Sequence, residues 1–157
     1  MALFMKFGDI KGSATEEHHK EWISINSFQF GVGRGISSPT GASADREASL
    51  PSVSEIVVTK EQDASSGPLF NQALGLADSV DVTIDFISTG KEDTPYLQYL
   101  LTDVLISGFS QSSGGDRPSE SLSLNFTKIE MKIAGSDPGN DQAPGASFVW
   151  NLATQAK

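Results

Sequence analysis

The chain of 157 residues contains no cysteine. Disulfide frameworks, thiolate metal sites and cysteine nucleophiles are therefore excluded. The opening segment MALFMKFGDIKG has no basic stretch followed by a long apolar run, and no segment approaches the roughly 20 apolar residues of a membrane-spanning helix. We therefore expect synthesis in the cytoplasm, no membrane insertion, and export, if any, without an ordinary signal peptide.

Basic residues are scarce, with 11 Lys and Arg against 20 Asp and Glu and a net charge of −9. Long-range repulsion from phosphate backbones makes nucleic acid an unfavourable partner. Catalytic patterns are also missing, because the serines lie outside any G-x-S-x-G elbow and His18 and His19 adjoin in a polar segment. Adjacent side chains of an extended segment point in opposite directions, so His18 and His19 are not expected to bind one metal ion together. We expect a solvated loop there. The sequence predicts no enzyme, no cofactor and no metal site.

Residues 96–133 form the segment around which the rest of the chain is organised. Apolar residues recur at every second position on both sides of a Gly/Ser/Pro cluster, which predicts two long antiparallel strands. A turn centred on Gly115 pairs Val104 with Phe126, Ile106 with Leu124, Leu101 with Ile129, and Tyr99 with Met131. The phase of the alternation breaks at 102–103 and at 127–128. These breaks then face each other, so both strands are expected to bend at one level.

Further strands are expected over residues 3–7, 22–30, 53–60, 80–88 and 148–152, with a phase break at 26–27. In the strand 80–88 the even positions from Val80 to Phe86 are expected to point inward, and Asp81, Thr83 and Asp85 outward. One short helix should follow Ser65 or Ser66, with an apolar stripe of Leu69, Phe70, Ala73 and Leu74. The bent strands favour one closed β-barrel of antiparallel strands over residues 1–157, with a short flanking helix; a flat sandwich is the alternative.

Two features are typical of a surface that contacts other proteins. Residues 31–51 are rich in Gly, Ser, Ala and Pro, and a long non-periodic loop of this kind is often a contact arm. Within it Arg34, Asp45, Arg46 and Glu47 are the candidates for contacts between subunits or stacked rings, with simple solvation as the alternative. The off-core strand positions are small and mostly uncharged: Ser24, Gln29, Ser107, Ser121, Ser123 and Asn125. Such a face suits packing against a symmetry mate or a wet lumen, although an ordinary Ser-rich surface has the same composition.

Several segments together resemble the haemolysin-coregulated (Hcp) proteins, the tube subunits of the bacterial type VI secretion system. They are FMKFGDIKGSA, ISINSFQFGVGR, VTKEQDASS, YLLTDVLISGFS, ESLSLNFTKIEMKI and SFVWNLATQAK, and they cover most of the chain in order. The segment Ser66-Gly67-Pro68 departs from the family, in which proline directly follows the serine.

The resemblance implies a barrel that assembles into a hexameric ring. Such rings stack into a tube, lie inside a contractile sheath, and are expelled with a spike protein into target cells. Their lumen binds and stabilises small effector proteins, and the position that faces it corresponds to Gln29 here. The alternative function is a monomeric binding module of jelly-roll or lectin type.

Overall fold

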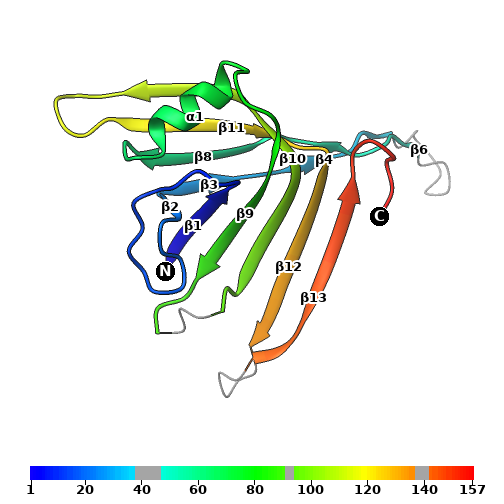
Figure 1. Cartoon of the computed structure of the whole chain (residues 1–157). Coiled ribbons are helices and arrows are strands. Elements are labelled where there is room, and N and C mark those ends of the chain that lie inside the picture. Colours follow the sequence, from blue (N-terminus) through cyan, green and yellow to red (C-terminus); the bar gives the residue numbers. More distant parts are fainter. Residues whose placement is uncertain (38–46, 91–93, 137–141) are drawn as a thin grey trace.

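The computed structural model describes residues 1–37, 47–90, 94–136 and 142–157. Its elements are β1 (Ala2–Phe7), β2 (Ile23–Ile25), β3 (Ser27–Gln29), β4 (Val32–Gly33), β5 (Ile36–Ser37), β6 (Glu47–Ala48), β7 (Ser52–Val53), β8 (Ile56–Glu61), α1 (Ser66–Ala73), β9 (Val80–Ile87), β10 (Leu97–Ser112), β11 (Ser119–Asn125), β12 (Lys128–Ser136) and β13 (Gln142–Asn151). The structure is thus mainly antiparallel β with one short helix, as predicted (Figure 1).

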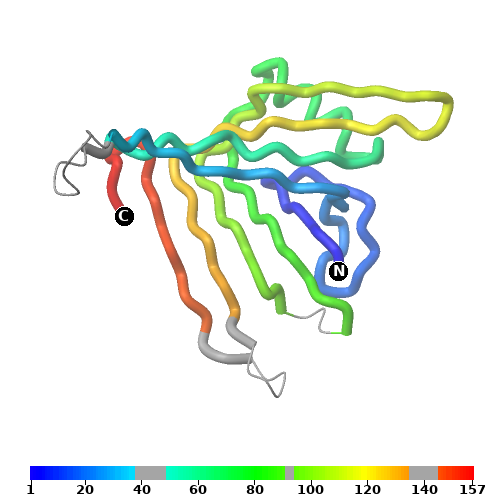
Figure 2. Tube along the Cα trace, turned by 180° about the vertical axis from the view of Figure 1, so that it is seen from behind, coloured from blue at the N-terminus to red at the C-terminus, as the bar shows by residue number. Residues whose placement is uncertain are grey.

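Strand β10 is the centre of the fold because it belongs to two groups of strands. Its first half pairs with β9 and β12, and its second half pairs with β11. The predicted register is confirmed at Leu101 with Ile129, Tyr99 with Met131, and Ile106 with Leu124. The predicted bend is confirmed as well: Asp103 has φ 52°, and the Thr127 amide donates to the Thr102 carbonyl over 3.0 Å. This bend turns β10 from one group of strands into the other (Figures 1 and 2).

The strands follow the order β2, β1, β9, β10, β11, β8, β3, with β12 and β13 added beside β10. Only Asn26 separates β2 from β3, and its amide donates to the Thr59 carbonyl of β8 over 2.7 Å. The hydrogen-bonded path therefore returns to the chain segment on which it begins. The predicted phase break at 26–27 marks this point. It lets one segment pair with β1 on one side and with β8 on the other.

The core lies inside this circuit. Its fully buried members include Met5, Phe7, Ile23, Ile56, Val58, Leu69, Ile84, Val104, Leu122 and Leu124. Aromatic rings of Phe28, Phe30, Phe86 and Tyr99 pack against one another at the edge of this cluster, with centroid separations of 5.0 to 6.0 Å. Because edge-to-face and offset-stacked rings attract beyond their buried area, they help to fix the curvature between the two groups of strands.

Helix α1 covers one face of the strands β10 and β11, at the top of Figure 1. The expected four-residue apolar stripe is wrong in part. Leu69 is fully buried and Ala73 packs on the core, whereas Phe70 and Leu74 are about half exposed. Gln72 takes the remaining inward position because a short straight helix buries only one narrow row of side chains. Among the described residues, no helix has the length and apolar character needed to cross a membrane.

The segment after Phe30 leaves the barrel as a two-stranded arm. Its base is the pairing of β4 with β7, and further out β5 pairs with β6. Backbone hydrogen bonds join Ser54 to Gly31 over 2.9 Å and Ser49 to Gly35 over 2.8 Å. The arm extends from the side of the molecule opposite to the turn between β10 and β11 (Figures 1 and 2). A segment without sequence periodicity is thus ordered β structure at its base.

Candidate functional site

One face of the strands β3, β8 and β11 carries small polar side chains. Cross-strand pairing places Ser27 beside Thr59 and Thr59 beside Ser121, and the hydroxyls of Ser27 and Thr59 lie 2.5 Å apart. The next row contains Gln29, Val57 and Ser123, and the row on the other side contains Glu61 and Ser119. These three rows carry one charge, on Glu61. We call this surface the polar face.

Gln29 lies on the polar face, as the alternation predicts. Its side chain is exposed, whereas the neighbouring Phe28 and Phe30 are half-buried and pack on the core. Gln29 is the last residue of β3, which pairs with β8 and stands at the end of the strand order, so Gln29 lies at the border of the polar face. Its position is thus consistent with contact to another molecule, and its role stays a prediction.

The arm carries the other predicted contact residues. Arg34 is exposed between β4 and β5, and the exposed Val32 and Ile36 lie on either side of it. Glu47 belongs to β6, where its backbone pairs with Ser37. Asp45 and Arg46 lie outside the described residues. The structure therefore places Arg34 on a projecting element, and the contacts of all four residues remain untested.

An apolar groove lies where the arm meets β12 and β13. It has a volume of about 280 Å³ and is lined by side chains that include Phe30, Val32, Val53, Met131 and Trp150. Phe148, at its rim, is 56% exposed. Strand β13 pairs only with β12 among the described strands, so its outer edge offers free backbone groups beside the groove. An open strand edge next to exposed apolar side chains is a surface that another protein chain can extend.

The expectation of a solvated loop is wrong for His19, which is only 3% exposed. Its Nδ1 lies 2.5 Å from Glu16, and its Nε2 lies 2.9 Å from Asp85. The ring stacks on Phe4 and meets the edge of Trp22. Asp85, expected to point to solvent, is also buried because the segment 8–22 folds back over the outer side of β1 and β9. The histidine therefore fastens this segment to the sheet.

Glu16 makes the stabilisation provided by this His19 cluster dependent on pH. Burial tends to raise the pKa of its carboxyl, but hydrogen bonds from the His18 amide and the His19 ring, with the charge of both rings, hold the pKa below its ordinary value of 4.5. The stabilisation it provides is therefore present above pH 4.5 and is lost as the pH falls below that value.

We expect Glu16→Gln to be less stable than the parent near neutral pH, with the difference narrowing in acid. Urea unfolding at a series of pH values measures the difference in unfolding free energy near neutral pH and its change in acid. Glu17→Gln, one position away and exposed, is the matched control and should follow the parent throughout. A difference between Glu16→Gln and the parent that stays constant down to strong acid would contradict the role of Glu16.

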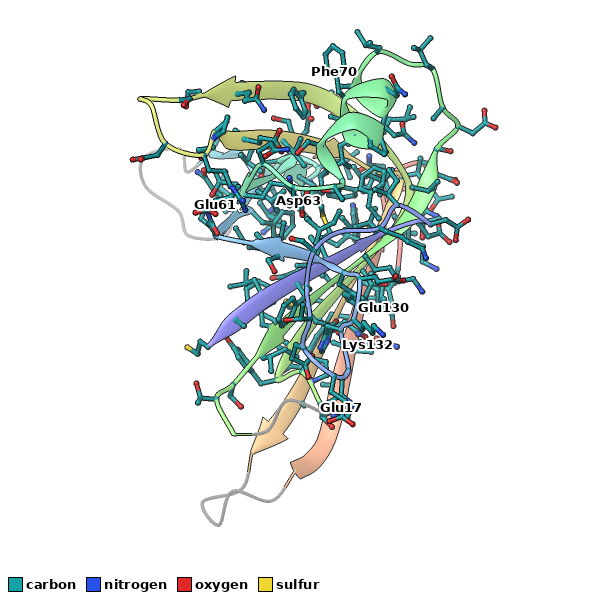
Figure 3. All side chains as sticks on the ribbon, turned by 60° about the vertical axis from the view of Figure 1, so that its left-hand side comes forward. Glu17, Glu61, Asp63, Phe70, Glu130 and Lys132 are labelled. Atoms are coloured by element: carbon teal, nitrogen blue, oxygen red, sulfur yellow. The ribbon has the colours of Figure 1, made fainter. Side chains whose placement is uncertain are left out.

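A second buried cluster of charged side chains, which was not predicted from the sequence, lies beneath α1. Lys60 of β8 is fully buried, with Nζ 2.6 Å from Glu120 of β11 and 3.0 Å from Asp63. Ser66, the first residue of α1, donates to the same Glu120 oxygen over 2.7 Å. Burial works against ionised Asp63, but hydrogen bonds from Ser65 and from Lys60, with the lysine charge, lower its pKa. Asp63 lies below α1, whereas Phe70 projects from the outer side of the helix (Figure 3).

Both clusters pair charges within the fold rather than at a site open to a substrate. The acids and bases bond one another, and no group of three or more potential metal ligands is found in the described ranges. The features open to solvent include the polar face, the arm and the apolar groove. All three are suited to contacts with other proteins.

Solved structures with the same fold include proteins described as belonging to the type VI secretion system. A structure described as a type six secretion system protein matches with a TM-score of 0.89 and 22% identity, over 98% of this chain and 97% of its own. A type VI secretion system effector from Yersinia pestis matches with a TM-score of 0.76 and 20% identity, over 95% and 98% of the two chains. Hcp1 from Salmonella typhimurium matches with a TM-score of 0.77 and 17% identity, over 98% and 95%.

Sequence comparison gives the family independently of the fold. Residues 4–133 match the family model described as "Type VI secretion system effector, Hcp". No curated protein matches the sequence. This family consists of structural proteins rather than enzymes, in agreement with the missing catalytic patterns. Because the match extends over most of the strands and α1, the chain belongs to the Hcp family of type VI secretion system tube proteins.

Proposed function

We propose that this protein assembles into hexameric rings that stack end to end as the tube of a type VI secretion system. The observation that carries the proposal is the open edge of β13 beside the apolar groove. A neighbouring copy that contributes a different surface to this edge gives a head-to-tail contact, and such contacts close into a ring when the rotation between copies allows it. The sheath and the spike of the secretion system are then partners of the assembled tube, which is expelled from the producing cell.

The mass of the purified protein in solution tests the ring. Size-exclusion chromatography with light scattering should give about six times the chain mass of 16.7 kDa, and negative-stain images should show closed rings. A monomer at high concentration would contradict the proposal and favour a monomeric binding module. As a matched pair, Phe148→Asp alters the rim of the groove and should weaken the ring, whereas Leu105→Asp alters an exposed apolar residue on β10 and should not.

We further propose that the polar face lines the ring lumen and holds small effector proteins. The three paired rows carry a single charge, on Glu61, and contain no lysine. A cargo surface can therefore approach them without displacing water from a tightly hydrated ammonium group. Gln29, exposed at the β3 border of this face, is the first candidate for contact. A neutral amide can both donate to and accept from a cargo, so it suits partners of different sequence.

Gln29→Arg should leave the ring intact but reduce the amount of co-purifying cargo several-fold. The long charged side chain narrows the available space and opposes the burial of apolar cargo surface. A pull-down with a tagged effector from the same secretion system gives the measurement, with ring integrity checked by light scattering. Gln62→Arg, the same change at an exposed position between β8 and α1, is the control. Equal cargo recovery in both variants would argue against a lumen role for Gln29.

A further inference from the structure

A second cavity lies between α1 and the turn that follows β1, and nothing described above uses it. Its volume is about 500 Å³, and most of its lining is apolar, including Ile10, Pro68, Leu76 and Val80. Leu76 is 72% exposed, so one wall of the cavity opens to solvent. An elongated, mostly apolar side chain would find matching walls there.

One of the residues that line this cavity carries a buried hydrogen-bond acceptor without a donor among the described residues. Gln72 lines the cavity and is only 3% exposed. Its Nε2 donates to the Asp78 carbonyl over 2.5 Å, which fixes the orientation of the amide because the opposite orientation would bring two oxygens together. The remaining oxygen, Oε1, is buried and has no hydrogen-bond partner within the described residues. A buried acceptor left in this state costs free energy that an N–H group from outside would recover.

The charge of the cavity selects the type of donor. Asp9 and Asp78 lie at its exposed rim. The one lysine in the lining, Lys11, is paired with Glu21 over 3.2 Å, so its charge is balanced locally. The rim is therefore negative. Apolar walls, acidic groups at the mouth and an unpaired acceptor inside together fit an arginine or lysine side chain, whose alkyl stem is apolar and whose head donates several hydrogen bonds.

The arm of the same protein carries such a side chain. Arg34 is exposed, and Val32 and Ile36 on either side of it are 60% and 54% exposed. The arm, in which Arg34 lies between β4 and β5, extends away from α1 on a different side of the molecule (Figures 1 and 2). A contact between the arm and this cavity would therefore join two copies. We propose that Arg34 of one copy enters this cavity in another copy, between Asp9, Asp78 and Gln72; this inference rests on the proposed stacking of rings.

Disulfide trapping tests this contact directly because the chain has no cysteine of its own. Gly33→Cys places a thiol beside Arg34 at a position where an added Cβ meets no atom within 4 Å, and Asn71→Cys places one at the exposed rim of the cavity. Both changes leave Arg34 and Gln72 in place. The double variant should form a ladder of covalent multimers on a non-reducing gel after mild oxidation. Adding Arg34→Gln should reduce the yield of the ladder at least several-fold, since the cation that holds the contact is removed.

Gly33→Cys combined with Ser113→Cys, at the turn between β10 and β11, is the matched control and should give no ladder. If rings of the Gly33→Cys, Asn71→Cys variant stack in electron micrographs but form no covalent ladder, the Arg34 contact is wrong. The proposed assembly into a tube would not be affected by that result. A ladder that is unaffected by Arg34→Gln would also overturn it. If light scattering shows only monomers, both the contact and the proposed ring assembly are wrong.

Discussion

Deletion of residues 35–47 should leave rings intact and abolish tubes. The deletion removes β5 and Glu47 of β6, and with them the pairing of these two strands, but keeps the pairing of β4 with β7, so the barrel and the open edge of β13 are unchanged. Contacts between stacked rings would lose the projecting part of the arm. Light scattering should therefore still give the hexamer mass, whereas electron microscopy under conditions that give tubes from the parent should show single rings only.

A variant in which residues 38–46 are replaced by a Gly/Ser segment of equal length separates the length of the arm from its sequence. If specific side chains in this range make the contact, that variant also fails to form tubes. The thermal unfolding midpoint of each variant should stay close to that of the parent, which would show that the barrel itself is undisturbed. Tubes of normal length from the deletion variant would contradict the role of the arm.

Replacement of Glu120 by Gln should destabilise the protein by about 3 kcal/mol, because breaking a buried ion pair leaves an uncompensated charge in the interior. Lys60 is fully buried and would keep only Asp63 as an ionised partner. The Glu120 carboxylate also accepts hydrogen bonds from Ser66 and Gln111, at 2.7 and 2.8 Å, and a single amide oxygen cannot accept from all three donors. Urea unfolding near neutral pH measures the difference.

Two controls separate the buried charge from loss of packing. Glu61→Gln changes an exposed carboxylate on β8, next in sequence to Lys60, and should alter the unfolding free energy by less than about 0.5 kcal/mol. The double variant Lys60→Met with Glu120→Leu removes the buried lysine and Glu120 and leaves Asp63 with its hydrogen bonds from Ser65, so it should recover part of the stability lost in Glu120→Gln. If the single and double variants are equally destabilised, packing rather than the unpaired lysine is responsible.

The sequence predicts most of the fold because the main hairpin is specified locally. A period of two over β10, β11 and β12 and matching phase breaks determine which residues pair. The same period could have identified the buried ion pair. Lys60 continues the inward phase of Ile56 and Val58, and Glu120 continues that of Leu122 and Leu124. Opposite charges at inward positions of two neighbouring strands are a sequence signal of a buried ion pair.

The cluster at His19 could not be predicted in this way. Asp85 is buried because the segment around His19, 66 residues earlier in the chain, folds over the outer face of β9. The alternation of apolar and polar residues in β9 does not predict that another segment covers this face. The buried Oε1 of Gln72, which has no hydrogen-bond partner among the described residues, could not be predicted either. Its environment depends on how the residues after α1 turn back to Asp78. Features that depend on contacts between distant segments are absent from local periodicity.

The closed path of strands also has a consequence for how the chain folds. Strand β1 pairs with β9 about 80 residues later, and β3 pairs with β8 about 30 residues later. Contacts between such distant residues close large loops and slow the folding reaction, so we infer that a nascent N-terminal third has no stable structure during translation. Under the proposed assembly, only complete chains released from the ribosome would then present the open edge of β13 to a neighbouring copy.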